Sequence, residues 1–208
     1  MPRTVAWAGR LVTTSIWKSP VAGRVRVEGV NLAGDAQADR RVHGGVHKAV
    51  YAYGEEDYAW WARHVPTTFE PGVFGENLTT AGIDLTRCVV GERWDVGSAT
   101  LEVSEPRLPC FKLGIRMGDA TFVERFEDAC RPGTYLRIVT PGDVAAGDTI
   151  RVHDVPDHGL TVVDLMTAEV RGDERLLRRI LENPDVSDAW VHRAERRLER
   201  RTDRAAKE

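Results

Sequence analysis

The sequence predicts a mainly β protein with some α structure, in which a barrel-like β domain with a few short helices precedes a small C-terminal three-helix unit. Two observations support this fold class. Short segments of alternating apolar and polar residues, separated by glycine and proline, fill most of the chain up to about residue 152, which is typical of barrels and sandwiches. From residue 157 onward the pattern changes to amphipathic stretches with helix start and stop signals.

The β part contains at least six expected strands. Alternation or enrichment in β-branched and aromatic residues indicates strands at residues 25–30, 49–53, 93–97, 100–104, 135–139 and 149–152. Two short helices interrupt them. Tyr58 and Trp61 lie on one face of a helix expected at residues 55–64, and Phe122, Val123 and Phe126 on one face of a helix at 119–129.

The C-terminal part contains three expected helices. Thr161 and Asp164 have the spacing of a capping box at the start of the first. The second covers residues 173–181 and ends before Pro184, and the third runs from 188 to about 200. We therefore divide the chain into a β domain, residues 1–153 with a core from about 25, and a three-helix domain, residues 157–204. A unit this small has a thin core and should lean on the β domain.

Composition excludes several classes of protein. The 208 residues are 42% hydrophobic and 29% charged, as in folded soluble proteins, and the net charge of −3 does not favour nucleic acid or anionic lipid as a partner. No apolar run is long enough to cross a bilayer, and the N-terminus lacks the apolar core of a signal peptide. Three widely spaced cysteines argue against a disulfide framework. We expect a cytoplasmic protein with reduced thiols and no membrane contact.

Cys110 is the most informative single residue. It follows the strand expected at 100–104 and lies in a turn that contains Pro109. Arg107 and Lys112 flank it, and positive charge near the sulfur favours the thiolate, the form that attacks electrophiles and binds metals. The alternative is a half-buried structural cysteine, which is the commoner use of an intracellular cysteine.

Three further clusters contain polar and glycine residues. Residues 34–48 combine Gly44 and Gly45 with basic neighbours, a pattern suited to an anion or to a solvated loop. Residues 72–79 place Asn77 after two glycines, which fits ligand recognition or a plain hairpin turn. Residues 131–135 form another basic glycine turn. The glycines between His43 and His47 argue against a helical metal pair, and no HExxH, GxSxG or P-loop motif is present.

The arginine-rich tail admits a rival function. Its helix-break-helix pattern with a basic last helix resembles a helix-turn-helix that binds DNA. However, Glu195, Glu199 and Asp203 alternate with the arginines at spacings suited to ion pairs on a solvated helix. The sequence therefore disfavours a nucleic-acid partner.

Four motifs, taken in order, resemble the MOSC-domain proteins, and within them the bacterial YiiM-like group. They are residues 34–35 (GD), 42–51 (VHGGVHKAVY), 74–78 (FGENL) and 106–113 (PRLPCFKL). Residues 161–201 are similar to the small "3-alpha" domain that follows MOSC in that group. The resemblance covers nearly the whole chain and implies a MOSC-type β-barrel domain.

The resemblance also implies a function. It implies binding of the molybdenum cofactor (Mo-molybdopterin), with Cys110 as the protein ligand to the metal and as the catalytic residue. The implied activity is that of a molybdenum-dependent oxidoreductase that reduces N-hydroxylated compounds such as purine bases and amidoximes, a detoxification reaction. Residues matched to cofactor binding are Arg41, His43, Gly44, Gly45, Lys48, Asn77 and Arg107. Glycine turns with Arg and Lys suit the cofactor's phosphate, and soft thiolate suits the metal.

The chain shows no flavin, haem or iron–sulfur signature, so this function requires a separate electron-donor protein, a flavin or iron–sulfur reductase, beside the small-molecule substrate. The alternative is a cofactor carrier or sulfur-transfer protein that uses Cys110 without reductase turnover. A homodimer is the default assembly, because closed two-fold dimers are the commonest soluble oligomers.

Overall fold

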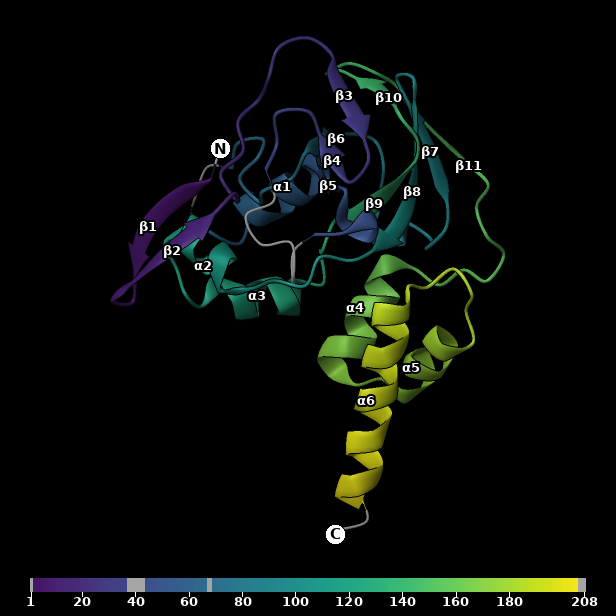
Figure 1. The fold of residues 1–208 in the computed structure, drawn as a ribbon. Coiled ribbons are helices and arrows are strands. Elements are labelled where there is room, and N and C mark those ends of the chain that lie inside the picture. Colours follow the sequence, from purple (N-terminus) through teal and green to yellow (C-terminus); the bar gives the residue numbers. More distant parts are fainter. Residues whose placement is uncertain (1, 37–43, 67–68, 206–208) are drawn as a thin grey trace.

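The computed structural model describes residues 2–36, 44–66 and 69–205 (Figure 1). Its strands are β1 (Arg3–Trp7), β2 (Arg10–Thr14), β3 (Val25–Glu28), β4 (Asn31–Leu32), β5 (Val50–Gly54), β6 (Leu78–Thr80), β7 (Arg93–Val96), β8 (Ala99–Glu105), β9 (Thr134–Thr140), β10 (Gly142–Val144) and β11 (Ile150–His153). The α-helices are α1 (Glu55–Ala62), α2 (Phe111–Met117), α3 (Phe122–Ala129), α4 (Val162–Arg171), α5 (Glu174–Leu181) and α6 (Asp188–Ala205). Two short 3₁₀ helices are η1 (Val46–Lys48) and η2 (Leu85–Arg87).

The main sheet is mixed and curls into a half-barrel. Its strands lie in the order β11-β7-β8-β9-β5-β6, and all neighbours are antiparallel except β5 and β6, which are parallel. Two smaller sheets accompany it, β10-β3-β4 and the ribbon β1-β2, which projects from one side of the β domain (Figure 1). The predicted class, a mainly β barrel-like domain followed by three helices, is confirmed. All six expected strands are present within one or two residues of their predicted bounds.

One buried cluster on the β domain is aromatic. Tyr53 at the end of β5 stacks on Phe74, with ring centroids 4.2 Å apart, and both rings contact Phe126 of α3. Trp61 of α1 closes the cluster and donates a 2.8 Å hydrogen bond from Nε1 to the Tyr53 hydroxyl. Buried aromatic rings contribute large apolar area, so this cluster fixes α1 and α3 against the sheet.

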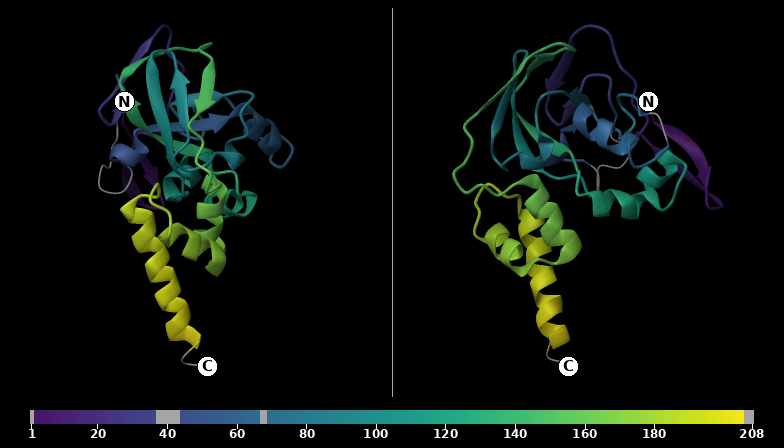
Figure 2. Two further views of the ribbon diagram at one scale, coloured as in Figure 1. Left: turned by 90° about the vertical axis from the view of Figure 1, so that its right-hand side faces the viewer. Right: turned by 180° about the vertical axis from the view of Figure 1, so that it is seen from behind.

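The three C-terminal helices pack beneath one end of the β domain (Figures 1 and 2). Val162 and Leu165 of α4 belong to the same buried cluster as Trp94 and Leu101 of the sheet. Backbone hydrogen bonds join the parts as well, from the Val162 N–H to the Cys88 carbonyl at 3.0 Å. The three-helix unit therefore leans on the β domain, as its size predicts. The division into domains at residues 153–157 remains a prediction.

Several elements were not predicted, namely the strands β1, β2, β4, β6 and β10, both 3₁₀ helices and α2. The ribbon β1-β2 turns at Ala8 and Gly9, which both have positive φ, and α2 begins directly after Cys110, in a segment that the sequence indicates as a turn. Among the described residues, no helix combines the length and apolar character needed to cross a membrane.

Candidate functional site

A cavity, open to solvent, lies where the segment after β2 meets β5, the Phe74–Gly75 turn and the Cys110 loop. Four of the predicted site residues line it together: Lys48, Asn77, Arg107 and Cys110. The structure thus brings together side chains that are up to 62 positions apart in the chain (48 to 110). Their chemical roles remain predictions.

Cys110 lines the cavity shortly after the end of β8. β8 delivers the chain to residues 106–109, and Cys110 is the N-cap residue of α2, with extended backbone and its carbonyl accepting from the Leu113 N–H at 2.8 Å. The thiol is free and half-buried. It is therefore held at a fixed point of the wall, yet open to the cavity.

Arg107 is buried behind Cys110. Its Nη1 donates to the Phe74 carbonyl, and its guanidinium carbon lies 5.3 Å from the centroid of the Tyr51 ring. Burial lowers the pKa of Arg107, but Tyr51, Tyr135 and Cys110 outweigh this effect, so the pKa lies above its usual value. A permanent positive charge is thus fixed at the wall of the cavity that Cys110 also lines.

Asn77 joins β5 to the segment that contains Asp35. Its Oδ1 accepts from the Tyr51 N–H at 3.0 Å, and its Nδ2 donates to Asp35 Oδ2 at 2.7 Å. Lys18 in turn donates to the other oxygen of Asp35. The amide is thus engaged by the protein itself, and the predicted role in orienting cofactor or substrate is untested.

The remaining predicted residues have different positions. Gly45 has φ 104° and precedes η1, but neither Gly44 nor Gly45 is among the described residues that line the cavity. Arg41 and His43 lie outside the described residues. The fourth sequence cluster divides: Tyr135 lines the cavity, whereas Arg131 faces away from it and pairs with the buried Asp57 at 2.6 Å.

Sequence reasoning missed the N-terminal contribution to the site. Ser15, Lys18, Asn31 and Asp35 line the cavity. Asp35 belongs to a motif that the sequence singles out, but the others lie in no recognisable pattern. They reach the site because the N-terminal segment packs on the Phe74–Gly75 turn, where a Cβ on Gly75 would come within 2.9 Å of Ile16 Cγ1.

The cavity residues fit a molybdenum cofactor. The Ser15 hydroxyl and Asn31 Oδ1 are buried and have no hydrogen-bond partner within the part of the chain that the structure describes, so they are available to a bound group. The same part contains no cluster of three His, Cys, Asp or Glu side chains suited to a metal. A single soft thiolate matches a metal whose other sulfur ligands come with its cofactor. The nearby cations match a phosphate.

The fold and cavity define a β-rich protein with a helical C-terminal unit and one cysteine-bearing, cation-lined site. A model of the MOSC domain family matches residues 39–151, and the chain belongs to this family. YflK of Bacillus subtilis, described as uncharacterized, is 30% identical over 191 residues, which cover 91% of this chain and 86% of that protein.

Two further similarities extend the comparison. The crystal structure of YiiM from Geobacillus stearothermophilus has a TM-score of 0.76 and 25% identity, with 95% of each chain covered. A protein of Gibberella moniliformis described as a reductase is 32% identical over 152 residues, which are 71% of this chain and 27% of that longer protein.

Proposed function

We propose that the protein binds the molybdenum cofactor and reduces N-hydroxylated compounds, such as N-hydroxylated purine bases and amidoximes, to the corresponding amines or amidines. The observation that carries the proposal is the convergence of a half-buried thiol and a buried guanidinium on one cavity of a MOSC-family chain. The similarity to a protein described as a reductase supports an oxidoreductase activity.

In this proposal Cys110 is the protein ligand to molybdenum. Arg107 brings a fixed positive charge to the same cavity, and the position of Cys110 at the start of α2 holds the sulfur at the wall. When bound, the cofactor supplies two-electron chemistry for cleavage of an N–O bond, while the chain binds and orients the reactants.

The rest of the cavity binds the cofactor and the substrate. Arg107 contributes positive charge that suits the cofactor's phosphate or pterin, with Arg41, His43, Gly44 and Gly45 as further candidates, and Lys48 brings a second positive charge to the cavity. Ser15 and Asn31 offer hydrogen-bonding groups to the pterin or to a substrate base. Electrons come from a separate donor protein, a flavin or iron–sulfur reductase.

Metal content of Cys110→Ala tests the proposal. We expect near-stoichiometric molybdenum in the wild type from a host that makes the cofactor, and loss of molybdenum and turnover in the variant. Cys130→Ala is the matched control, because Cys130 is also free and half-buried but does not line the cavity.

Each outcome separates the candidate functions. Molybdenum in the wild type without turnover of N-hydroxylated substrates under a chemical reductant indicates the cofactor carrier. Absence of molybdenum from the wild type, or equal content in Cys110→Ala, contradicts the assignment of Cys110.

A further inference from the structure

A buried carboxylate pairs with a lysine of the cavity wall. Glu105, the last residue of β8, is only 4% exposed, and its Oε1 lies 3.4 Å from Nζ of Lys48, which lines the cavity. Burial of a carboxylate is unfavourable unless nearby charges compensate for the lost hydration. A neutral side chain would fill the same space, so the acid at this position calls for a chemical role.

The backbone aims Glu105 at Lys48. Val103 pairs with Leu136 and Glu105 with Tyr135, so two residues of β8 advance against one of β9, which is a β-bulge at Ser104. Bulges redirect side chains, and they are frequent beside active sites. Ser104 Oγ lies 2.5 Å from the His47 carbonyl oxygen, which fixes η1, and with it Lys48, to the same strand.

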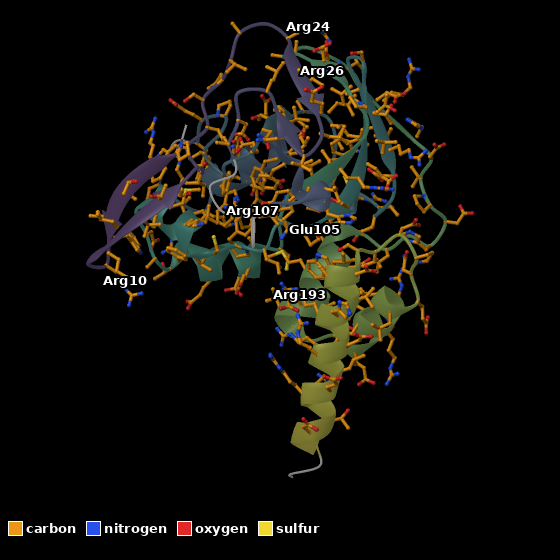
Figure 3. All side chains as sticks on the ribbon, in the orientation of Figure 1. Arg10, Arg24, Arg26, Glu105, Arg107 and Arg193 are labelled. Atoms are coloured by element: carbon orange, nitrogen blue, oxygen red, sulfur yellow. The ribbon has the colours of Figure 1, made fainter. Side chains whose placement is uncertain are left out.

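Charged groups from two elements and a tyrosine from a third surround the carboxyl. Lys48 and His47 of η1 and Arg193 of α6 lower the pKa of Glu105, and Tyr135 lies beside it on β9. Burial is the larger effect and raises the pKa above its usual value. Figure 3 labels Glu105 between Arg107 and Arg193. Glu105 therefore keeps its proton to a higher pH than an exposed glutamate does.

We propose that Glu105 positions Lys48 and supplies it with protons during reduction, an inference that rests on the proposed function. The reaction is R–NH–OH + 2 e⁻ + 2 H⁺ → R–NH₂ + H₂O. The N–O bond breaks with two electrons from the reduced donor protein. The Lys48 ammonium protonates the leaving hydroxyl to give water, the Glu105 carboxyl reprotonates Lys48, and bulk water supplies the second proton and restores Glu105.

This assignment separates Lys48 from the phosphate-binding cations. When Glu105 is ionised, it balances the charge of Lys48 across 3.4 Å, which weakens the attraction of that ammonium for a phosphate. The role in proton supply predicts that Lys48→Met keeps molybdenum and loses turnover, whereas a phosphate-binding role predicts that it loses molybdenum.

The experiment compares wild type, Glu105→Gln and Lys48→Met as molybdenum-loaded protein. Glu102→Gln is the matched control. Glu102 is a buried acid of the same strand, but it pairs with Arg93 and Arg137 instead of with a residue that lines the cavity. Molybdenum content and kcat against pH are measured with an N-hydroxylated purine base and a chemical reductant. We expect full molybdenum content, with kcat reduced about tenfold in Glu105→Gln and about a hundredfold in Lys48→Met.

The dependence of kcat on pH shows whether Glu105 supplies protons. Wild-type kcat falls as pH rises through the pKa of Glu105, and Glu105→Gln lacks that fall. Urea unfolding gives a readout independent of turnover. The pKa of Glu105 is raised in the folded state, so the stability of the wild type declines as pH rises from the unfolded pKa through the folded one. Glu105→Gln lacks this decline, so its urea midpoint rises relative to that of the wild type over this pH range.

An unchanged pH profile and kcat in Glu105→Gln, with an active wild type, overturns the inference and leaves the reductase function standing. Loss of molybdenum in Lys48→Met also overturns it. A wild type that holds no molybdenum and shows no turnover overturns the proposed function, and the inference with it.

Discussion

At the scale of single residues, Gly133 sets the position of one cavity wall. It lies in the turn between α3 and β9 with φ 62°, and the hydroxyls of Tyr51 and Tyr53 donate to the carbonyls of Pro132 and Arg131, the two residues before it. A Cβ at this position would come within 2.5 Å of the Ala52 carbonyl oxygen. Only glycine allows β9 to begin so close to β5, and Tyr135 reaches the cavity from that start.

Gly133→Ala should therefore destabilise the protein by more than its backbone conformation explains. Gly159 is the matched control, since its φ of 58° is nearly the same and nothing lies within 4 Å of an added Cβ. We expect Gly159→Ala to lower the free energy of unfolding by about 1 kcal/mol, and Gly133→Ala by about 1–3 kcal/mol more because of the clash. Urea unfolding measures both, and equal losses would contradict the proposed close contact.

The site residues differ in how far they are predictable from sequence. Cys110, Arg107 and Lys48 lie in short motifs next to predicted strands, Asn77 lies in a glycine-containing motif, and all four line the cavity. Lys18, Ser15 and Asn31 carry no such signal. They join the site through tertiary packing of the N-terminal segment, which has no periodic sequence pattern. Glu105 is directed toward Lys48 by a β-bulge, which the alternation of apolar and polar residues does not reveal.

At the scale of elements, the start of α4 is the one most clearly specified by its local sequence. Thr161 Oγ1 accepts from the Asp164 N–H at 3.1 Å, and the Asp164 carboxylate accepts from the Thr161 N–H at 3.0 Å. Both hydrogen bonds of the predicted capping box are thus present, with Asp in the position usually held by Glu or Gln. The cap lies next to the contact between the helices and the β domain, where Thr161 forms a β-bridge with Val89.

Thr161→Ala should lower the free energy of unfolding by about 1 kcal/mol, because an N–H at the start of the helix loses its partner. Thr167→Ala in the middle of α4 is the control, and it should be neutral or slightly stabilising since alanine is the better helix former. Thermal unfolding followed by circular dichroism compares the two. A loss in Thr167→Ala as large as that in Thr161→Ala would argue against the cap.

Two of the elements that were not predicted, the hairpin β1-β2 and helix α2, have a weak signal in the local sequence. The hairpin β1-β2 turns through Ala8 at φ 46° and Gly9 at φ 76°, and alanine is an unusual residue at positive φ. Helix α2 has seven residues, includes Gly114, and has no side-chain hydrogen bond at its N-cap. Both depend on packing against the β domain more than on propensity, whereas α4 and α5 begin with side-chain caps visible in the sequence.

At the scale of the whole molecule, one apolar cluster runs from the sheet into the C-terminal helices. It includes Trp94 and Val103 of the sheet, Leu165 of α4, Leu177 of α5 and Trp190 of α6. A helical unit of this size cannot bury enough apolar surface alone. The cluster makes the stability of the helices a property of the entire chain.

Leu165→Ala tests this coupling. Leu165 is fully buried, so its truncation should lower the free energy of unfolding by about 3–5 kcal/mol through lost burial and a cavity. Leu181→Ala is the control, because Leu181 is 37% exposed. We expect tryptophan fluorescence and far-ultraviolet circular dichroism to report one shared transition, shifted in Leu165→Ala. Two separate transitions would show that the helices unfold independently.

The same cluster limits how the chain can be cut or fused. A boundary near residue 157 looks like a convenient point for removing the helical unit, since glycine and proline lie there. Removal of the chain after that point would expose part of the apolar surface of Trp94 and Leu101 to water. Such a truncation should yield insoluble material, and a fluorescent tag or purification handle belongs at the far end of α6, which extends away from the β domain (Figure 2).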